Sequence, residues 1–271
     1  MTDAAARPGS ILGTRVTRTE DPSLLTGAAQ YVDDLGLTNP LHAVFARSDV
    51  AHGTINSIGI AEATALPGVV AVVTAADLGI APHHGFAPVH DDFKRPPLAD
   101  GTVRFVGEPI AVVLAETAAI GEDAAQLIWA DIGPLPAIID MEAALTADAI
   151  PIFSAHGDNQ AIRTVGSDRS DPSGADHVVR GRYINQRVAV VPIEPDRAAA
   201  EMDDRGRIKL YASTQMPHAL HDQLAGALGI DKDEIHVVTP QVGGGFGGKA
   251  GLMAEHVVIS ALTKRFARPV V

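Results

Sequence analysis

The sequence predicts a mixed α+β fold in two domains, on the evidence of its length, its apolar patterning and one polar gap. Its 271 residues exceed the usual size of a single domain, so about two domains are expected. Short apolar runs typical of strands alternate with alanine-rich segments typical of helices. A polar stretch rich in Gly, Ser, Asp and Asn predicts a linker at 146–177, between a first domain at 15–145 and a second at 178–271.

Apolar runs predict three strands and two helices in the first domain. The strands are expected at residues 41–47, 69–73 and 110–114. A short helix over 61–66 should end at the breaker pair Pro67 and Gly68. A longer helix is expected over 117–130, which is rich in alanine and has carboxylates near its start, where they suit the helix dipole. Four prolines in residues 79–100 predict an irregular surface loop.

The second domain is predicted to hold strands, a hairpin and two helices. Strands are expected at residues 178–183, 188–191 and 235–238, and a hairpin should pair 198–202 with 208–212. One helix is expected over 217–228, closed by Gly229, and another over 252–267. The chain then ends on the apolar pair Val270 and Val271. Either this pair docks on a sheet, or it marks a domain that continues on another polypeptide. In the second case the apolar end is exposed, which predicts that the chain is poorly soluble on its own.

Composition excludes several classes of protein. The chain carries 21 Lys and Arg against 33 Asp and Glu, and this net charge of −12 disfavours nucleic acid as a partner. No apolar run reaches the roughly 18 residues of a membrane-spanning helix. The absence of cysteine excludes disulfides, thiolate metal sites and cysteine-bound iron–sulfur clusters from this chain. The N-terminus lacks the layout of a secretory signal, so we expect a cytoplasmic protein.

The histidines do not predict a metal site. His83, His84 and His90 lie in the proline-rich loop without helical spacing and are interpreted as an incidental surface cluster. His218 and His221 share a face of a predicted helix, but no carboxylate motif joins them. No residue is therefore assigned as a metal ligand.

A glycine-rich loop, GGGFGGK at residues 243–249, lies between the last predicted strand and the last predicted helix. Glycines let the backbone approach a ligand, and their N–H groups with a helix N-terminus can bind an anion. A dinucleotide site would want an acidic residue about 20 positions later, and none follows Glu255. A P-loop would need a hydroxyl where Ala250 stands. A tight turn without a ligand and a cofactor loop of another kind both stay open.

Further motifs run along almost the whole chain. They are RTEDPSLLTG (18–27), YVDDL (31–35), GEPIAVVLAET (107–117), EDAA (122–125), GPLPA (133–137), PIEP (192–195) and ASTQ (212–215). In this order and spacing, together with the glycine loop, they resemble the large subunits of molybdenum hydroxylases. This is the family of xanthine dehydrogenase, aldehyde oxidase and aerobic carbon monoxide dehydrogenase. The resemblance implies an α/β-hammerhead domain followed by the first part of a molybdopterin-binding domain.

The resemblance also implies site residues. The cofactor would be molybdopterin carrying molybdenum, in its cytosine dinucleotide form, with metal ligands supplied by the pterin and by oxo, sulfido and hydroxo groups. The residues implied to bind it are Gln215, Gly244, Gly245, Phe246, Gly247 and Gly248. Gln215 would donate to an oxo ligand and Phe246 would orient the substrate, which makes these two the implied catalytic residues. Glu194 is interpreted as part of the scaffold and Lys249 as solvated.

By the same resemblance, the protein is a molybdenum-dependent oxidoreductase subunit. It would oxidise an aldehyde, an N-heterocycle or a CO-type small substrate with oxygen from water. Large subunits of the family are longer than this chain, and their catalytic glutamate lies in the part that is absent here. We therefore expect another polypeptide to complete the site, with iron–sulfur and FAD subunits as electron carriers. The alternative is a truncated scaffold or assembly protein that binds no cofactor.

Overall fold

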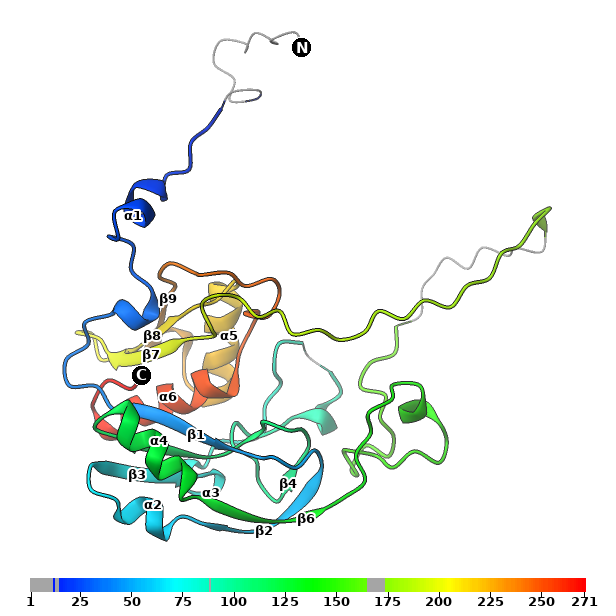
Figure 1. Cartoon of the computed structure of the whole chain (residues 1–271), viewed down its shortest axis with the longest axis horizontal. Helices are drawn as coiled ribbons and strands as arrows, with labels where there is room; N and C mark the ends of the chain where they lie inside the picture. Colours follow the sequence, from blue (N-terminus) through cyan, green and yellow to red (C-terminus); the bar gives the residue numbers. More distant parts are fainter. Residues whose placement is uncertain (1–11, 13–14, 88, 165–173) are drawn as a thin grey trace.

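The computed structural model describes residues 12, 15–87, 89–164 and 174–271. The leading segment, on which the expectation of no secretory signal depends, is largely outside these residues. Two three-stranded sheets build the first domain, and a third sheet with two helices builds the second (Figure 1). None of the described helices is long and apolar enough to cross a membrane.

The first sheet has the strand order β1-β5-β3 and is antiparallel throughout. Its strands are β1 (His42–Arg47), β5 (Pro109–Ala115) and β3 (Val69–Thr74). All residues of β5 are buried, as expected of a continuous apolar run in a central strand. One face is covered by α2 (Ala61–Ala65) and α4 (Ala118–Gln126), where Ala63, Val113 and Ala124 form part of a small core.

The second sheet has the order β4-β2-β6, and none of its three strands was predicted. Its strands are β4 (Thr102–Val103), β2 (Gly53–Gly59) and β6 (Trp129–Pro134). The register of β2 against β6 shifts between Ile55 and Ser57, which breaks the alternation that would identify a strand. The helix predicted over 117–130 is therefore wrong at its end, because Trp129 already pairs with Gly59 of β2.

The third sheet has the order β7-β8-β9 and belongs to the second domain. Its strands are β7 (Ala198–Met202), β8 (Ile208–Ala212) and β9 (Ile235–Val238). The predicted hairpin of β7 and β8 is confirmed, and β9 runs parallel to β8 after the crossover helix α5 (Pro217–Leu228). Pro217 opens α5, and Gly229 closes it at a φ of +64°.

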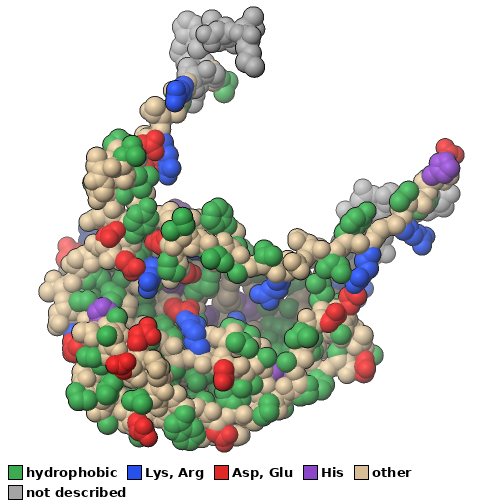
Figure 2. Space-filling model, viewed as in Figure 1, with side chains coloured by type: hydrophobic (Ala, Val, Ile, Leu, Met, Phe, Trp, Pro, Cys, Tyr) green, Lys and Arg blue, Asp and Glu red, His purple; other side chains and the backbone are tan. Residues whose placement is uncertain are grey.

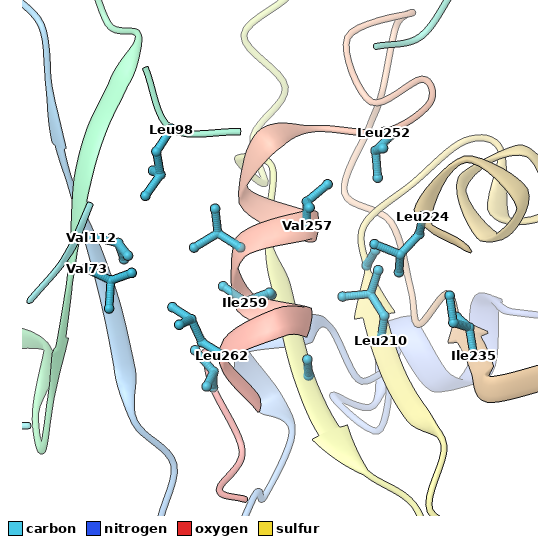
Figure 3. Close-up of a cluster of buried hydrophobic side chains, with 14 of the residues drawn as sticks. Val73, Leu98, Val112, Leu210, Leu224, Ile235, Leu252, Val257, Ile259 and Leu262 are labelled. Atoms are coloured by element: carbon cyan, nitrogen blue, oxygen red, sulfur yellow. The ribbon is translucent and has the colours of Figure 1, made fainter. Parts of the chain in front are cut away.

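Helix α6 (Ala254–Phe266) joins the two domains into one hydrophobic core. In Figure 3 it lies between Val73 and Val112 of the first sheet and Leu210 of β8. Val257, Ile259 and Leu262 of the helix are all buried in this cluster. The helix therefore packs on a face of each domain at once.

The terminal apolar pair docks against the sheets. Val270 is fully buried and forms a parallel bridge with Leu41 and an antiparallel bridge with Ala200 of β7. The expectation of an exposed apolar end is therefore wrong, because Val270 fills the seam between the two domains.

The strands predicted at 178–183 and 188–191 are also wrong. These residues form an extended arm, residues 174–193, that leaves the body of the molecule and carries no strand (Figures 1 and 2). Val179 and Tyr183 are each 93% exposed. A strand needs a neighbouring strand for its backbone hydrogen bonds, and no described segment supplies one here.

Short helices complete the described chain. They are α1 (Asp21–Leu25), η1 (Val32–Asp34), α3 (Ala75–Leu78), η2 (Asp91–Phe93), η3 (Ala143–Leu145) and η5 (Lys232–Glu234). The proline-rich loop at 79–100 is irregular except for η2 and an isolated bridge between His83 and Arg95.

Candidate cofactor-binding site

The glycine loop follows β9 and precedes α6, as predicted, and its backbone has a positive φ at Gly244, Phe246 and Gly247. Gly244 has a φ of +101°, a conformation that side chains strongly disfavour. Phe246 has a φ of +50°, which is uncommon for a bulky residue and marks a constrained turn. The residue is 75% exposed. The phenylalanine therefore projects from the loop and does not plug the core beneath it.

Gln215 lies directly under this loop, between β8 and α5. Its side-chain Oε1 accepts hydrogen bonds from the backbone N–H of Gly247 at 2.9 Å and of Lys249 at 3.3 Å. Its own backbone N–H donates to the carbonyl oxygen of Lys249 at 2.9 Å. The two bonds to Oε1 fix the orientation of the amide, so that Nε2 points away from the N–H groups of Gly247 and Lys249. Within the described chain, Nε2 has no hydrogen-bond partner, so its two N–H donors are available.

Gly245 is held against Gln215 without room for a side chain. A Cβ atom at this position would lie 2.5 Å from Gln215 Oε1, well inside van der Waals contact. The close approach of loop and amide therefore requires glycine. Gly248 is confined in the same way, by the side chain of Val190 at the base of the arm.

A buried ion pair supports the loop from below. Lys249 Nζ lies 2.8 Å from Glu194 Oε2 and 2.7 Å from Ser213 Oγ. Ser213 Oγ donates to the same carboxylate oxygen at 2.6 Å, and the backbone N–H of Gly243 donates to it at 2.7 Å. The Lys249 side chain is only 2% exposed, so the interpretation of this lysine as solvated is wrong. Its ammonium group is committed to Glu194, whereas the lysine of a P-loop must be free for a phosphate.

Burial and charge shift three titratable groups around this pair. Burial opposes ionisation of Glu194, but the hydrogen bonds from Lys249, Ser213 and Gly243 outweigh it and hold the pKa of Glu194 below its ordinary value. Burial raises the pKa of Asp196 to about 6; the charge of Lys249 opposes this shift, and the carboxylates of Glu255 and Glu194 add to it. Burial lowers the pKa of His256 to about 4, so this histidine is neutral at pH 7.

The structure brings the sequence-predicted site residues together at one place. Gln215 contacts the loop at Gly245 and Gly247, and the Phe246 ring lies beside Gly244. The sequence interpretation of Glu194 as a scaffold residue agrees with its contacts, but Ser213 and Lys249 were missed as its partners. No local pattern marks a buried lysine, because its partners lie 36 and 55 positions away in the chain.

The exposed groups at the loop fit a molybdopterin centre. They are the N–H donors of Gln215 Nε2, the aromatic ring of Phe246 and the backbone of Gly247, while Gly245 is buried and lets the loop pack against the Gln215 amide. An amide N–H can donate to an oxo ligand without changing its charge, and an aromatic ring can stack on a flat substrate. The site contains no protein donor for molybdenum, and a pterin dithiolene needs none.

Comparisons with known proteins agree with this description. Residues 26–136 match the family described as aldehyde oxidase and xanthine dehydrogenase, a/b hammerhead domain. Residues 153–271 match the family described as molybdopterin cofactor-binding domain. Together these matches cover both halves of the described fold.

Individual relatives match nearly the whole of this chain. The nicotine 6-hydroxylase large subunit of Paenarthrobacter nicotinovorans is 36% identical over 96% of this chain and 33% of its own length. The carbon monoxide dehydrogenase large chain of Afipia carboxidovorans is 33% identical over 91% of this chain and 32% of its own. Among solved structures, quinoline 2-oxidoreductase from Pseudomonas putida 86 superposes with a TM-score of 0.86 at 38% identity, covering 95% of this chain and 34% of that one.

The chain thus spans about a third of the length of the relatives it matches. Its fold is an α/β-hammerhead domain followed by the first part of a molybdopterin-binding domain. The chain belongs to the family of molybdenum hydroxylase large subunits that includes xanthine dehydrogenase, aldehyde oxidase and carbon monoxide dehydrogenase.

Proposed function

We propose that this chain forms part of the molybdenum subunit of a hydroxylase or dehydrogenase and binds molybdopterin through Gln215 and residues 244–248. The observation that carries the proposal is the Gln215 amide. Its oxygen accepts hydrogen bonds from two backbone N–H groups of the glycine loop, while the two N–H groups of its nitrogen have no partner among the described residues. Such an amide is positioned to donate to an anionic or oxo group bound over the loop.

The bound molybdenum would supply oxidation of the substrate with oxygen derived from water. The residues of this chain would bind and orient. Gln215 would hold the cofactor in place through its N–H donors, and Gly245 lets the loop backbone pack directly against that amide. Phe246 offers its exposed ring to a flat or small substrate, where stacking contributes about 1 kcal/mol and restricts the binding angle.

The substrate class we propose is a small aldehyde, N-heterocycle or CO-type molecule, and relatives favour the N-heterocycle. Two of the relatives carry the names of a nicotine hydroxylase and a quinoline oxidoreductase, and both compounds are aromatic N-heterocycles.

We propose the cytosine dinucleotide form of the cofactor, on the family resemblance alone. The proposed domain limits are 15–145 and 178–271, with a linker at 146–177.

We further propose that a second polypeptide completes the site, and that iron–sulfur and FAD subunits carry the electrons away. The arm supports the first part of this proposal. Val179, Tyr183 and Ile193 are almost fully exposed along an extended backbone without a neighbouring strand. Apolar residues exposed in sequence on an extended segment are typical of a surface that another chain covers. The complex would work in the cytoplasm.

The test uses the chain co-purified with its completing polypeptide from cells that make molybdenum cofactor. Molybdenum and released nucleotide are measured per chain. Near-stoichiometric amounts are expected for the unaltered chain. Gln215→Glu keeps the oxygen that accepts from Gly247 but replaces the outward N–H donors with a carboxylate oxygen, so at least a tenfold loss of bound molybdenum is expected.

Gln126→Ala is the matched control, because this glutamine is exposed on α4, far from the loop in sequence. It should leave the molybdenum content unchanged. A complex that contains no molybdenum, or that retains it fully in Gln215→Glu, would contradict the proposal. The first result would favour a scaffold without cofactor.

A further inference from the structure

A cluster of two histidines and an aspartate joins two segments that lie far apart in the sequence. His90 and Asp92 belong to the proline-rich loop around η2 (Asp91–Phe93), and His156 lies in the turn after residue 150. One ligand atom from each of the three side chains lies within 4.8 Å of the other two. His90 was interpreted as incidental because the loop histidines lack helical spacing, and its partner His156 lies outside that loop.

Two imidazole nitrogens of this cluster face one carboxylate oxygen. Both His90 Nδ1 and His156 Nδ1 lie 3.2 Å from the same oxygen, Asp92 Oδ2. His90 Nδ1 accepts a long hydrogen bond of 3.3 Å from the backbone N–H of Asp92, so it carries no proton to offer the carboxylate. Two acceptors therefore face each other at 3.2 Å. A positive ion between them would convert this repulsion into attraction.

His156 is held in the orientation that a metal ligand needs. Its side chain is 17% exposed and packs against the rings of Phe93 and His90, each at a centroid distance of 4.6 Å. Its other ring nitrogen, Nε2, lies 3.4 Å from Asp158 Oδ1. In the tautomer that donates from Nε2 to Asp158, the Nδ1 lone pair is directed at the cluster. In the other tautomer Nδ1 donates to Asp92 Oδ2 at 3.2 Å, and a bound cation would replace that proton.

We propose that His90, Asp92 and His156 bind a divalent transition metal of the zinc class. Two imidazole nitrogens and one carboxylate oxygen suit Zn²⁺, whereas Mg²⁺ and Ca²⁺ prefer all-oxygen sites. Water would occupy the remaining positions, since the three described ligands leave them free. The ligand atoms lie within 4.8 Å of one another, and the exposed His90 and Asp92 side chains would have to rotate to reach metal–ligand distances of about 2.0–2.2 Å.

The proposed metal would clamp the proline-rich loop to the segment that leads toward the arm. The ligands Asp92 and His156 are 64 positions apart, and a link of this span removes much of the freedom of the chain between them. The site uses no residue of the glycine loop. Its test is therefore independent of molybdopterin.

The experiment is equilibrium dialysis of the full chain against Zn²⁺ after chelator treatment, with metal measured per chain. One Zn²⁺ per chain is expected, together with a zinc-dependent rise in melting temperature and visible d–d bands on Co²⁺ substitution. His156→Gln and His90→Gln should each weaken zinc binding by at least about tenfold. Because His90 is exposed, His90→Gln should fold, and it tests zinc binding even if His156→Gln does not fold.

His84→Gln is the matched control, because His84 lies in the same loop but contacts Asp91, at 3.0 Å. It should bind zinc as the unaltered chain does. The proposal is overturned if no zinc binds, if His90→Gln binds it unchanged, or if His84→Gln loses as much affinity as His90→Gln.

Discussion

Lys249 Nζ lies 2.8 Å from Glu194 Oε2, and both side chains are closed off from solvent under the glycine loop. Fifty-five positions separate the two residues. Glu194 lies at the root of the arm, and its carboxylate also accepts from Gly243 at the start of the loop. The ion pair thus anchors the loop to the arm. It also holds in place the loop backbone to which Gln215 is hydrogen-bonded.

Removing the lysine should strongly destabilise the chain. In Lys249→Met the Glu194 carboxylate stays buried without its counter-charge, and the loss of one partner of a buried pair costs about 3–5 kcal/mol. Urea unfolding monitored by circular dichroism measures the change. The double variant Lys249→Met/Glu194→Leu should recover most of the loss, because it leaves no buried charge unpaired.

Lys232→Met is the control for this prediction. Lys232 Nζ lies at the same distance of 2.8 Å from Asp222 Oδ1, but both side chains are well exposed. Little change in stability is expected. An effect as large as that of Lys249→Met would show that burial is not the cause.

Gly245→Ala should disturb the Gln215 amide. The added Cβ would meet Gln215 Oε1 at 2.5 Å, so either the loop or the amide must move. We expect stability to fall by about 1–3 kcal/mol and bound molybdenum in the completed complex to fall at least severalfold. Gly226→Ala is the matched control, since nothing lies within 4 Å of its Cβ position on α5. Equal molybdenum contents in the two variants would contradict the prediction.

Asp196 gives the stability of the chain a predictable dependence on pH. Its folded-state pKa of about 6 exceeds the unfolded value of about 3.9, so the folded state keeps a proton that the unfolded state releases. The contribution of Asp196 to stability is therefore favourable near pH 4 and is lost as the pH rises to about 6. Because its side chain is 35% exposed, we expect a loss of only about 1 kcal/mol.

Asp196→Asn should remove this loss. Its stability relative to the unaltered chain is expected to increase between pH 4 and 6 and then to stay constant, as measured by chemical unfolding at a series of pH values. A difference that does not change with pH would show that Asp196 does not titrate in this window.

Most of the regular structure could be predicted from local sequence patterns. The apolar runs of β1, β3 and β5 and the hairpin of β7 and β8 were found because each pairs in regular register over most of its length. Strand β2 was missed because its bulge at Ile55 disrupts the alternation. The segment 178–191 has the composition of strands, but local composition cannot say whether a neighbouring strand exists.

The site could be predicted only in part. The family motifs located Gln215 and the glycine loop, because these residues are close in sequence to recognisable patterns. The burial of Lys249 was missed because it depends on Glu194 and Ser213, which only the tertiary fold brings near. Similarly, His90 meets His156 only after the proline-rich loop folds onto a later segment.

Leu262→Ala should destabilise both domains together. This side chain is fully buried in the core that α6 shares with the first and third sheets, so its truncation should cost about 2–5 kcal/mol. Trp129 lies in β6 and reports on the second sheet, while circular dichroism reports on the helices. Both signals should shift to the same lower denaturant midpoint. The exposed Leu145→Ala serves as the control, and two separate transitions in Leu262→Ala would contradict a shared core.

The position of α6 also bears on how the chain is made on the ribosome. The face of the first sheet that packs on Val257 and Leu262 is complete about 140 residues before that helix emerges. At typical rates of about 5–20 residues per second, this apolar face remains without its partner for about 7–28 seconds. During that interval the nascent hammerhead exposes Val73 and Val112. Chaperones that shield newly made strands should therefore bind this chain early and leave it only after α6 has docked.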